Sequence, residues 1–233
     1  LALHRNLTLV ALCLLCVHVG FAVADSYVDI RWWQAFLPAA ELGVGGCTAG
    51  NIIVDGGFET TDPGTLDNPN WTETSTQFGS PFCSLAVCGN GGGTAGPRTG
   101  TFWSWLGGTT GVGAEVASMA QSVVFPGAGA TVNLNFYLWI GAVSTPFTDT
   151  LMVQVDGVTQ TTFTEPSTAE PGYTLRTVDL SAFANGASHE VKFLYNQPAG
   201  GGTGNFSVDD VTLDVTCAAS AVPVANQIDT PLA

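Results

Sequence analysis

The sequence has very little positive charge. Only five of its 233 residues are lysine or arginine, against 19 aspartates and glutamates, and the formal net charge is −14. A chain this acidic is repelled by phosphate backbones and by anionic membrane surfaces. The composition therefore argues against nucleic acid as a partner. It also makes the capture of a cation favourable.

Long hydrophobic runs are equally scarce, and the one present lies at the start. Residues 7–21 (LTLVALCLLCVHVGF) follow His4 and Arg5 and precede Ala-Val-Ala at 22–24, a small-x-small cleavage pattern. This order is typical of a secretory signal peptide over residues 1–24. The run is short for a membrane helix, and polar residues follow at once. We expect a secreted or cell-surface protein with no membrane span in its mature chain.

Cysteine and histidine are sparse once that segment is removed. The cysteines that remain are Cys47, Cys83, Cys88 and Cys217, and His189 is the only histidine. Their spacing does not suit a zinc site, whereas paired cysteines are usual in exported proteins. Four cysteines allow three pairings. We favour Cys47–Cys217, because these two bracket the patterned region, with Cys83–Cys88 closing a small loop.

No helical periodicity appears after the signal peptide. Segments rich in β-branched and aromatic residues recur instead, several with strict alternation, and turn residues separate them; the segments are 101–107, 115–125, 130–140, 149–157, 173–183 and 189–196. Asp156-Gly157 and Asn185-Gly186 suit tight turns. We predict an all-β fold, an antiparallel β-sandwich (jelly roll) of about nine or ten strands, over residues 47–217.

Extended flanks lie on both sides of this domain. Residues 25–46 form an N-terminal extension that contains the apolar stretch IRWWQAFLP, and residues 218–233 form a polar C-terminal tail. The extension could support self-association by docking on a neighbouring subunit, or it could fold back over its own sheet. The glycine-rich runs at 89–96 and 200–204 lack a Gly-Lys-Ser/Thr ending, so we expect loops and no phosphate-binding site.

The stretch NIIVDGGFET, residues 51–60, ends a short apolar run with two glycines, an aromatic residue and Glu59. A second acidic stretch, NFSVDDVTLDV, holds Asp209 and Asp210 near the other end of the domain. The first and last strands of a sandwich often lie side by side, and the longer predicted disulfide would hold them together. We therefore expect Glu59 to lie near the two aspartates.

Three carboxylates at one place repel one another unless a cation lies among them, and no lysine or arginine is close in the sequence. Ca²⁺ is the natural candidate, because it takes six to eight oxygen ligands from carboxylates and backbone carbonyls. Gly56 and Gly57 would let the backbone turn its carbonyls toward the ion. The alternative is a plain glycine turn beside a solvated glutamate.

Five segments together resemble a known superfamily. They are NIIVDGGFE, GTFWSWLGG, QSVVFPGAGATVNLNFYLWI, DTLMVQVDG and NFSVDDVTLDV. The chain resembles the galactose-binding-domain-like jelly rolls of exported, often bacterial, surface proteins, to which many carbohydrate-binding modules belong. That resemblance implies a structural Ca²⁺ held by the Glu59 side chain, the Gly57 carbonyl and Asp209, with Asp210 as a neighbour and the Gly100 carbonyl as a further ligand.

Carbohydrate modules of this kind stack sugar rings on exposed aromatic side chains. The candidates in this sequence are Trp71, Trp103, Trp105, Trp139 and Tyr173. The alternative is that these side chains pack in the core, since aromatic residues favour strands in any case.

An enzyme is the weakest hypothesis from the sequence. His189 has no nucleophile elbow or neighbouring cysteine to activate. We expect a non-catalytic protein that acts in adhesion or interaction at a cell surface or matrix, with another surface protein as its partner. The alternative is a carbohydrate-binding module that recognises a glycan. The domain fills most of the chain, which favours the first of these.

Overall fold

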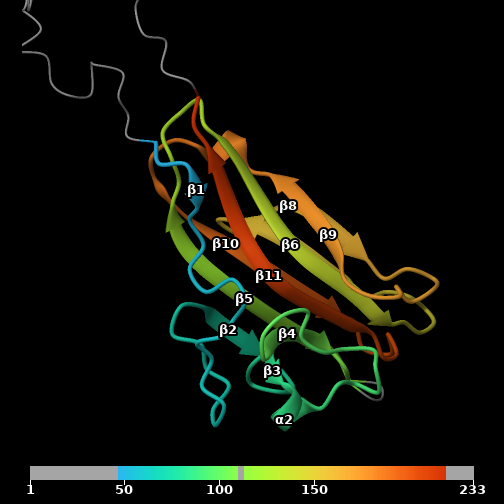
Figure 1. Ribbon diagram of the computed structural model, residues 1–233. Helices are drawn as coiled ribbons and strands as arrows, with labels where there is room; N and C mark the ends of the chain where they lie inside the picture. The colour runs from blue at the N-terminus through green and yellow to red at the C-terminus, as the bar shows by residue number, and fades with distance from the viewer. Residues whose placement is uncertain (1–46, 110–112, 219–233) are drawn as a thin grey trace, which may run out of the picture. The chain divides into compact units, whose positions relative to one another are not determined.

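The computed structural model describes residues 47–109 and 113–218 (Figure 1). The predicted signal peptide (1–24), the N-terminal extension (25–46) and all of the predicted tail except Ala218 lie outside the described residues. The strands that are described form two antiparallel sheets, so the predicted β-sandwich is confirmed. No helix in these two ranges is long and apolar enough to cross a membrane.

One sheet has six strands and the other has five. The first contains, in spatial order, β3 (Phe82–Ser84), β4 (Phe102–Gly107), β11 (Asn205–Thr216), β6 (Thr131–Ala142) and β9 (Thr174–Asp179), with β1 (Gly50–Asn51) paired to β11. The second contains β2 (Thr72–Ser75), β5 (Glu115–Val124), β10 (Ser188–Gln197), β7 (Thr150–Val155) and β8 (Val158–Thr164). From β4 to β11 every connection except the β7–β8 hairpin changes sheet, which is the jelly-roll arrangement.

Alternating side chains explain why these segments form strands. In β6 every second residue from Val132 to Ile140 points inward and is buried, while the residues between them are half-exposed. Phe136 meets Phe193 of the opposite sheet edge-on, with ring centroids 4.9 Å apart. Burial of these apolar faces between the sheets supplies the main driving force for the fold.

Both ends of the domain meet at the C-terminal end of β11 in the first sheet. β1 pairs with the end of β11, and a disulfide joins Cys47 to Cys217 across 170 residues of sequence. A second disulfide joins Cys83 to Cys88 around the short helix α2 (Leu85–Cys88). Both predicted pairings are therefore present.

The short strands β2 and β3 and the hairpin strand β8 were not among the expected segments. β8 (VTQTTFT) is an edge strand whose residues are all exposed or half-exposed, so its sequence shows no apolar alternation. The turn before it is the predicted one, with positive φ at both Asp156 and Gly157. The 3₁₀ turn η3 (Ser181–Phe183) completes the described elements.

Candidate functional site: an aromatic pocket and an acidic cluster

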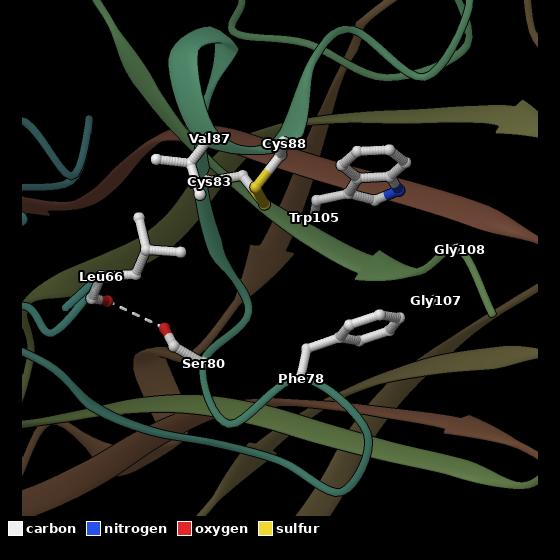
Figure 2. A pocket seen from close by; sticks show the side chains of 9 residues that line it. All are labelled: Leu66, Phe78, Ser80, Cys83, Val87, Cys88, Trp105, Gly107 and Gly108. Carbon is white, nitrogen blue, oxygen red and sulfur yellow. Dashed lines mark hydrogen bonds between the residues drawn. A yellow bond between two sulfur atoms is a disulfide. The ribbon is translucent and has the colours of Figure 1, made fainter. Parts of the chain in front are cut away.

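A pocket of about 370 Å³ opens beside the end of β4 (Figure 2). Its lining comes from the loops before β3, from α2 and from β4, and consists of Leu66, Phe78, Ser80, Cys83, Val87, Cys88, Trp105, Gly107 and Gly108. In Figure 2 the rings of Phe78 and Trp105 lie on opposite sides of this space.

The side chain of Trp105 reaches the pocket because of its place on β4. Phe102 and Leu106 face the core, so Trp103 and Trp105 lie on the other face of the strand. Trp103 is fully buried there, whereas Trp105 is half-exposed and stacks on it with ring centroids 6.2 Å apart.

Gly108 lets the chain turn closely around the Trp105 indole. Its φ is +75°, a backbone conformation that favours glycine, and a Cβ at this position would lie 3.3 Å from the indole ring. The indole Nε1 is buried without a hydrogen-bond partner in the described part of the chain. The pocket wall is thus the exposed part of a flat aromatic ring.

Phe78, on the other side, is 58% exposed although it is a large apolar residue. Its amide donates a 3.0 Å hydrogen bond to Ser75 Oγ, which in turn donates to the carboxylate of Glu115. Glu115 is fully buried and also accepts bonds from the Thr76 hydroxyl and the Gln77 amide. This buried carboxylate therefore anchors the loop that holds Phe78 in solvent.

The rest of the pocket is mainly apolar. Val87 is 54% exposed on α2, and the disulfide between Cys83 and Cys88 fixes that helix beside the opening. The Ser80 hydroxyl donates to the carbonyl oxygen of Leu66. The arrangement suits a ligand with a flat apolar face, because such a face can lie against the aromatic rings while its polar groups stay in water.

The five aromatic residues named from the sequence do not gather at this pocket. Trp71 and Trp103 are 5% and 0% exposed, which contradicts the prediction that they lie at the surface. Trp71 packs against Phe58 and donates its Nε1 hydrogen to the Asp55 carbonyl. Trp71 belongs to the hydrophobic core, whereas Trp103 is buried on the face of β4 that points away from the core.

Trp139 and Tyr173 are half-exposed and pack on each other, with ring centroids 5.6 Å apart. Trp139 donates to the Glu170 carbonyl and Tyr173 to the Gly96 carbonyl, so both polar groups are used within the protein. Trp105 alone of the five predicted residues lines the pocket. No pattern in the sequence marks Phe78, which stands in a polar stretch without periodicity.

The predicted acidic residues do come together between the first and last strands. A Cβ built on Gly57 would lie 3.6 Å from Asp210 Oδ1 and 3.9 Å from Glu59 Cγ, so both side chains border one small space. Glu59 Oε1 accepts bonds from the amides of Thr101 and Phe102, directly after Gly100.

Asp209 is the buried member of this cluster. One carboxylate oxygen accepts bonds from the amides of Arg98 and Thr99, and the other accepts one from Asp210. Burial raises the pKa of Asp209 to about 7, and the nearby Asp210 carboxylate adds to the increase.

A cation that the sequence did not place lies beside Asp210. The Arg98 guanidinium pairs with Asp210 Oδ2 at 2.5 Å and lies over the Tyr137 ring, while the Thr99 hydroxyl donates to Asp210 Oδ1. Arg98 is 112 residues away in the chain, so only the fold brings it here. The expectation of three carboxylates without a basic neighbour is therefore wrong in this respect.

The donor set remains compatible with Ca²⁺. Arg98 balances one of the three formal negative charges of Glu59, Asp209 and Asp210, which leaves two. No three His, Cys, Asp or Glu side chains within the described ranges are arranged to hold an ion by themselves, so Ca²⁺ here would also need carbonyl oxygens such as that of Gly57. Calcium at this place stays a prediction.

Comparison with known protein families finds no match, and no curated protein matches the chain. Solved structures similar to it include TmCBM61 in complex with β-1,4-galactotriose, at 13% identity over 70% of this chain and 97% of that one, with a TM-score of 0.46. The CBM22-1 xylan-binding domain of Paenibacillus barcinonensis Xyn10C is 19% identical over 74% and 99%, with a TM-score of 0.42.

A cyclase from Fischerella sp. TAU is similar to the same degree, at 13% identity over 73% of this chain and all of that one, with a TM-score of 0.44. Carbohydrate-binding modules are thus among the structures that the chain is similar to. Because the set includes both binding modules and a cyclase, the ligand of this chain has to be argued from its own residues.

Proposed function

We propose that this chain is an exported, non-catalytic protein that binds a glycan in the pocket between Trp105 and Phe78. The observation that carries the proposal is the pair of accessible aromatic rings on opposite sides of one pocket. Two disulfides fit an extracellular location, where oxidising conditions preserve them.

The chemistry of a sugar ring suits this pocket. One face of a pyranose presents mainly C–H groups, and it can lie against an indole or phenyl ring while the hydroxyls at the edge remain hydrated. The pocket volume of about 370 Å³ lies in the range of small-molecule sites.

A glycan array with the secreted protein, followed by affinity electrophoresis in the polysaccharide that gives the strongest signal, tests this function. Trp105→Ala and Phe78→Ala should each weaken the affinity at least about tenfold, because each removes one aromatic wall. Val158→Ala is the matched control, since Val158 is an exposed apolar residue on β8, outside the pocket lining. The proposal is overturned if the polysaccharide does not retain the wild-type protein. It is also overturned if both pocket variants are retained as strongly as the wild type.

Adhesion or assembly through another surface protein, the first expectation from the sequence, stays a prediction. The apolar segment within residues 25–46, which adds some weight to that prediction, lies outside the described residues. The pocket favours the glycan, because its aromatic pair forms a defined concave site for a small ring.

A further inference from the structure

Asp149 is a buried carboxylate directly before β7 that neither lines the pocket nor belongs to the Glu59 cluster, although its partner Tyr195 lies against Gly107 of the lining. Its side chain is fully buried, and Oδ2 accepts a 2.5 Å hydrogen bond from the Tyr195 hydroxyl. Oδ1 is also buried and has no hydrogen-bond partner in the described part of the chain. A buried carboxylate oxygen without a partner is costly, so this atom calls for an explanation.

A second buried carboxylate lies beside the first. Glu165 follows β8 and is 5% exposed; its two oxygens accept hydrogen bonds from the amides of Ser144 and Asp149, at 2.7 and 3.3 Å. No lysine, arginine or histidine within residues 47–109 and 113–218 forms a salt bridge with either acid. Two buried acids without a basic partner need another source of positive charge or must take up protons.

A glycine-rich loop closes tightly around the Asp149 carboxylate. A Cβ built on Gly201 would lie 2.9 Å from the Pro198 carbonyl oxygen and 3.0 Å from both Asp149 Oδ1 and Thr148 Oγ1. Three oxygen atoms from three residues therefore surround one point, and the unpartnered Oδ1 is among them. A side chain at position 201 would fill the space between them.

Gly204, at the end of the same loop, faces the other oxygen of the Asp149 carboxylate. A Cβ on Gly204 would lie 2.5 Å from Asp149 Oδ2 and 3.6 Å from Glu165 Oε1. Both glycines are buried, and both have to lack a side chain for the two carboxylates to fit. The loop thus joins carboxylate, hydroxyl and carbonyl oxygens, which are the ligands that hard divalent cations prefer.

We propose that Asp149 and Glu165, with the Thr148 hydroxyl and the Pro198 carbonyl, form a binding site for a hard divalent cation of the Ca²⁺ type. The site is separate from the predicted Glu59 site and does not depend on glycan binding. The cation would lie among these oxygens beside Gly201 and give Asp149 Oδ1 a partner. It would also hold the 198–204 loop against the start of β7.

The ionisation behaviour of Asp149 agrees with this geometry. Burial raises its pKa to about 6; the hydrogen bond from Tyr195 opposes that increase, and the nearby Glu165 carboxylate adds to it. Without a cation, the charged form of Asp149 is therefore disfavoured. A bound divalent ion would supply the missing compensation and lower this pKa again.

Calorimetric titration of Ca²⁺ into the metal-stripped protein tests the site, with Tb³⁺ luminescence as a second readout. Tyr195 contacts Asp149 directly and can sensitise Tb³⁺ emission. The titration is carried out in a Glu59→Gln background, so that the predicted first site does not contribute. We expect one Ca²⁺ per chain and an affinity at least about tenfold lower with Asp149→Asn or with Glu165→Gln.

Glu115→Gln is the matched control, because Glu115 is equally buried and has no salt-bridge partner, yet three protein donors already satisfy it. Its Ca²⁺ affinity should equal that of the parent. The proposal is overturned if the Glu59→Gln protein does not bind Ca²⁺. It is also overturned if Asp149→Asn or Glu165→Gln leaves the Ca²⁺ affinity unchanged, or if the Glu115→Gln control loses Ca²⁺ binding.

Amide exchange covers the case in which an acid variant fails to fold. In the Glu59→Gln protein, Ca²⁺ should slow exchange in the 199–204 loop and at the start of β7, because the ion would hold both segments. Unchanged exchange in these segments at saturating Ca²⁺ overturns the proposal without recourse to any variant at Asp149 or Glu165.

Discussion

The amide of Val211 donates a 2.9 Å hydrogen bond to the carbonyl oxygen of Gly56. The contact brings the backbone of β11 so close that a Cβ on Gly56 would lie 1.8 Å from the Val211 carbonyl oxygen. Gly57 is different, since its nearest neighbour would be Asp210 Oδ1 at 3.6 Å, an ordinary contact. The two glycines of the DGG sequence therefore serve different needs.

Alanine at these two positions should have unequal effects. Gly56→Ala forces two backbones apart and should lower the free energy of unfolding by about 2–3 kcal/mol, as overpacking of a close contact does. Gly57→Ala should change it by less than about 1 kcal/mol, because the space is open and alanine reduces the entropy of the unfolded chain. Urea unfolding of both variants measures the difference. If both variants lose the same free energy of unfolding, the close contact with Val211 is not the reason for glycine at position 56.

The two disulfides should contribute unequally to stability. Chain entropy predicts that loss of the Cys47–Cys217 bridge, which closes a loop of 170 residues, costs about 5 kcal/mol. Loss of the Cys83–Cys88 bridge, which closes a loop of five, should cost about 2 kcal/mol. Paired serine substitutions and denaturant unfolding test this order. The short bridge should instead matter more for glycan affinity, because both its cysteines line the pocket.

The predicted calcium between the first and last strands has its own test. Glu59→Gln should remove one Ca²⁺ per chain from the stoichiometry and lower the midpoint of thermal unfolding in excess Ca²⁺. It should also reduce the effect of EDTA on that midpoint. If Glu59→Gln binds as many Ca²⁺ ions per chain as the wild type, Glu59 is not a Ca²⁺ ligand. Its role would then be to accept hydrogen bonds from the Thr101 and Phe102 amides.

A surface pair gives a prediction for pH. His189 Nδ1 lies 2.6 Å from Asp156 Oδ2, and this hydrogen bond, helped by the Glu190 amide, lowers the pKa of Asp156. Because the folded pKa lies below the unfolded one, the stabilisation is present above the unfolded pKa and is lost as the pH falls through the folded one.

His189→Ala should therefore raise the pKa of Asp156 toward its ordinary value. An NMR titration of the side-chain carboxyl carbon measures the change, with Asp179 as an internal reference, because its pKa is lowered by Ser181 and not by histidine. A pKa of Asp156 that stays unchanged in the variant would assign the depression to the Glu190 amide alone.

Patterns that repeat along the chain were readable from the sequence. The alternation of Leu134, Phe136 and Leu138 predicted a strand with one buried face, and β6 has that face against the opposite sheet. The two outer cysteines bracket the patterned region and are bonded. These features follow from local periodicity and from the need to close a sandwich.

The pocket was not readable in the same way. Phe78 is held in solvent by a loop whose anchor, Glu115, is 37 residues further along the chain, and no periodic pattern marks either residue. Trp103 and Trp105 look alike in the sequence, yet the first is buried and the second lines the pocket. Arg98 reaches Asp210 only through the folded arrangement of loop and strand.

The disulfide between Cys47 and Cys217 also determines where the two flanks join the domain. Its Cα atoms are 5.8 Å apart, so both flanks leave the sandwich at the end of β11. The pocket lies near the other end of that strand, where Asn205 pairs with Gly107. Twelve residues of strand at about 3.3 Å each separate the two ends by roughly 35–40 Å. The two residues at which the flanks join the domain and the aromatic pocket therefore lie at opposite ends of β11.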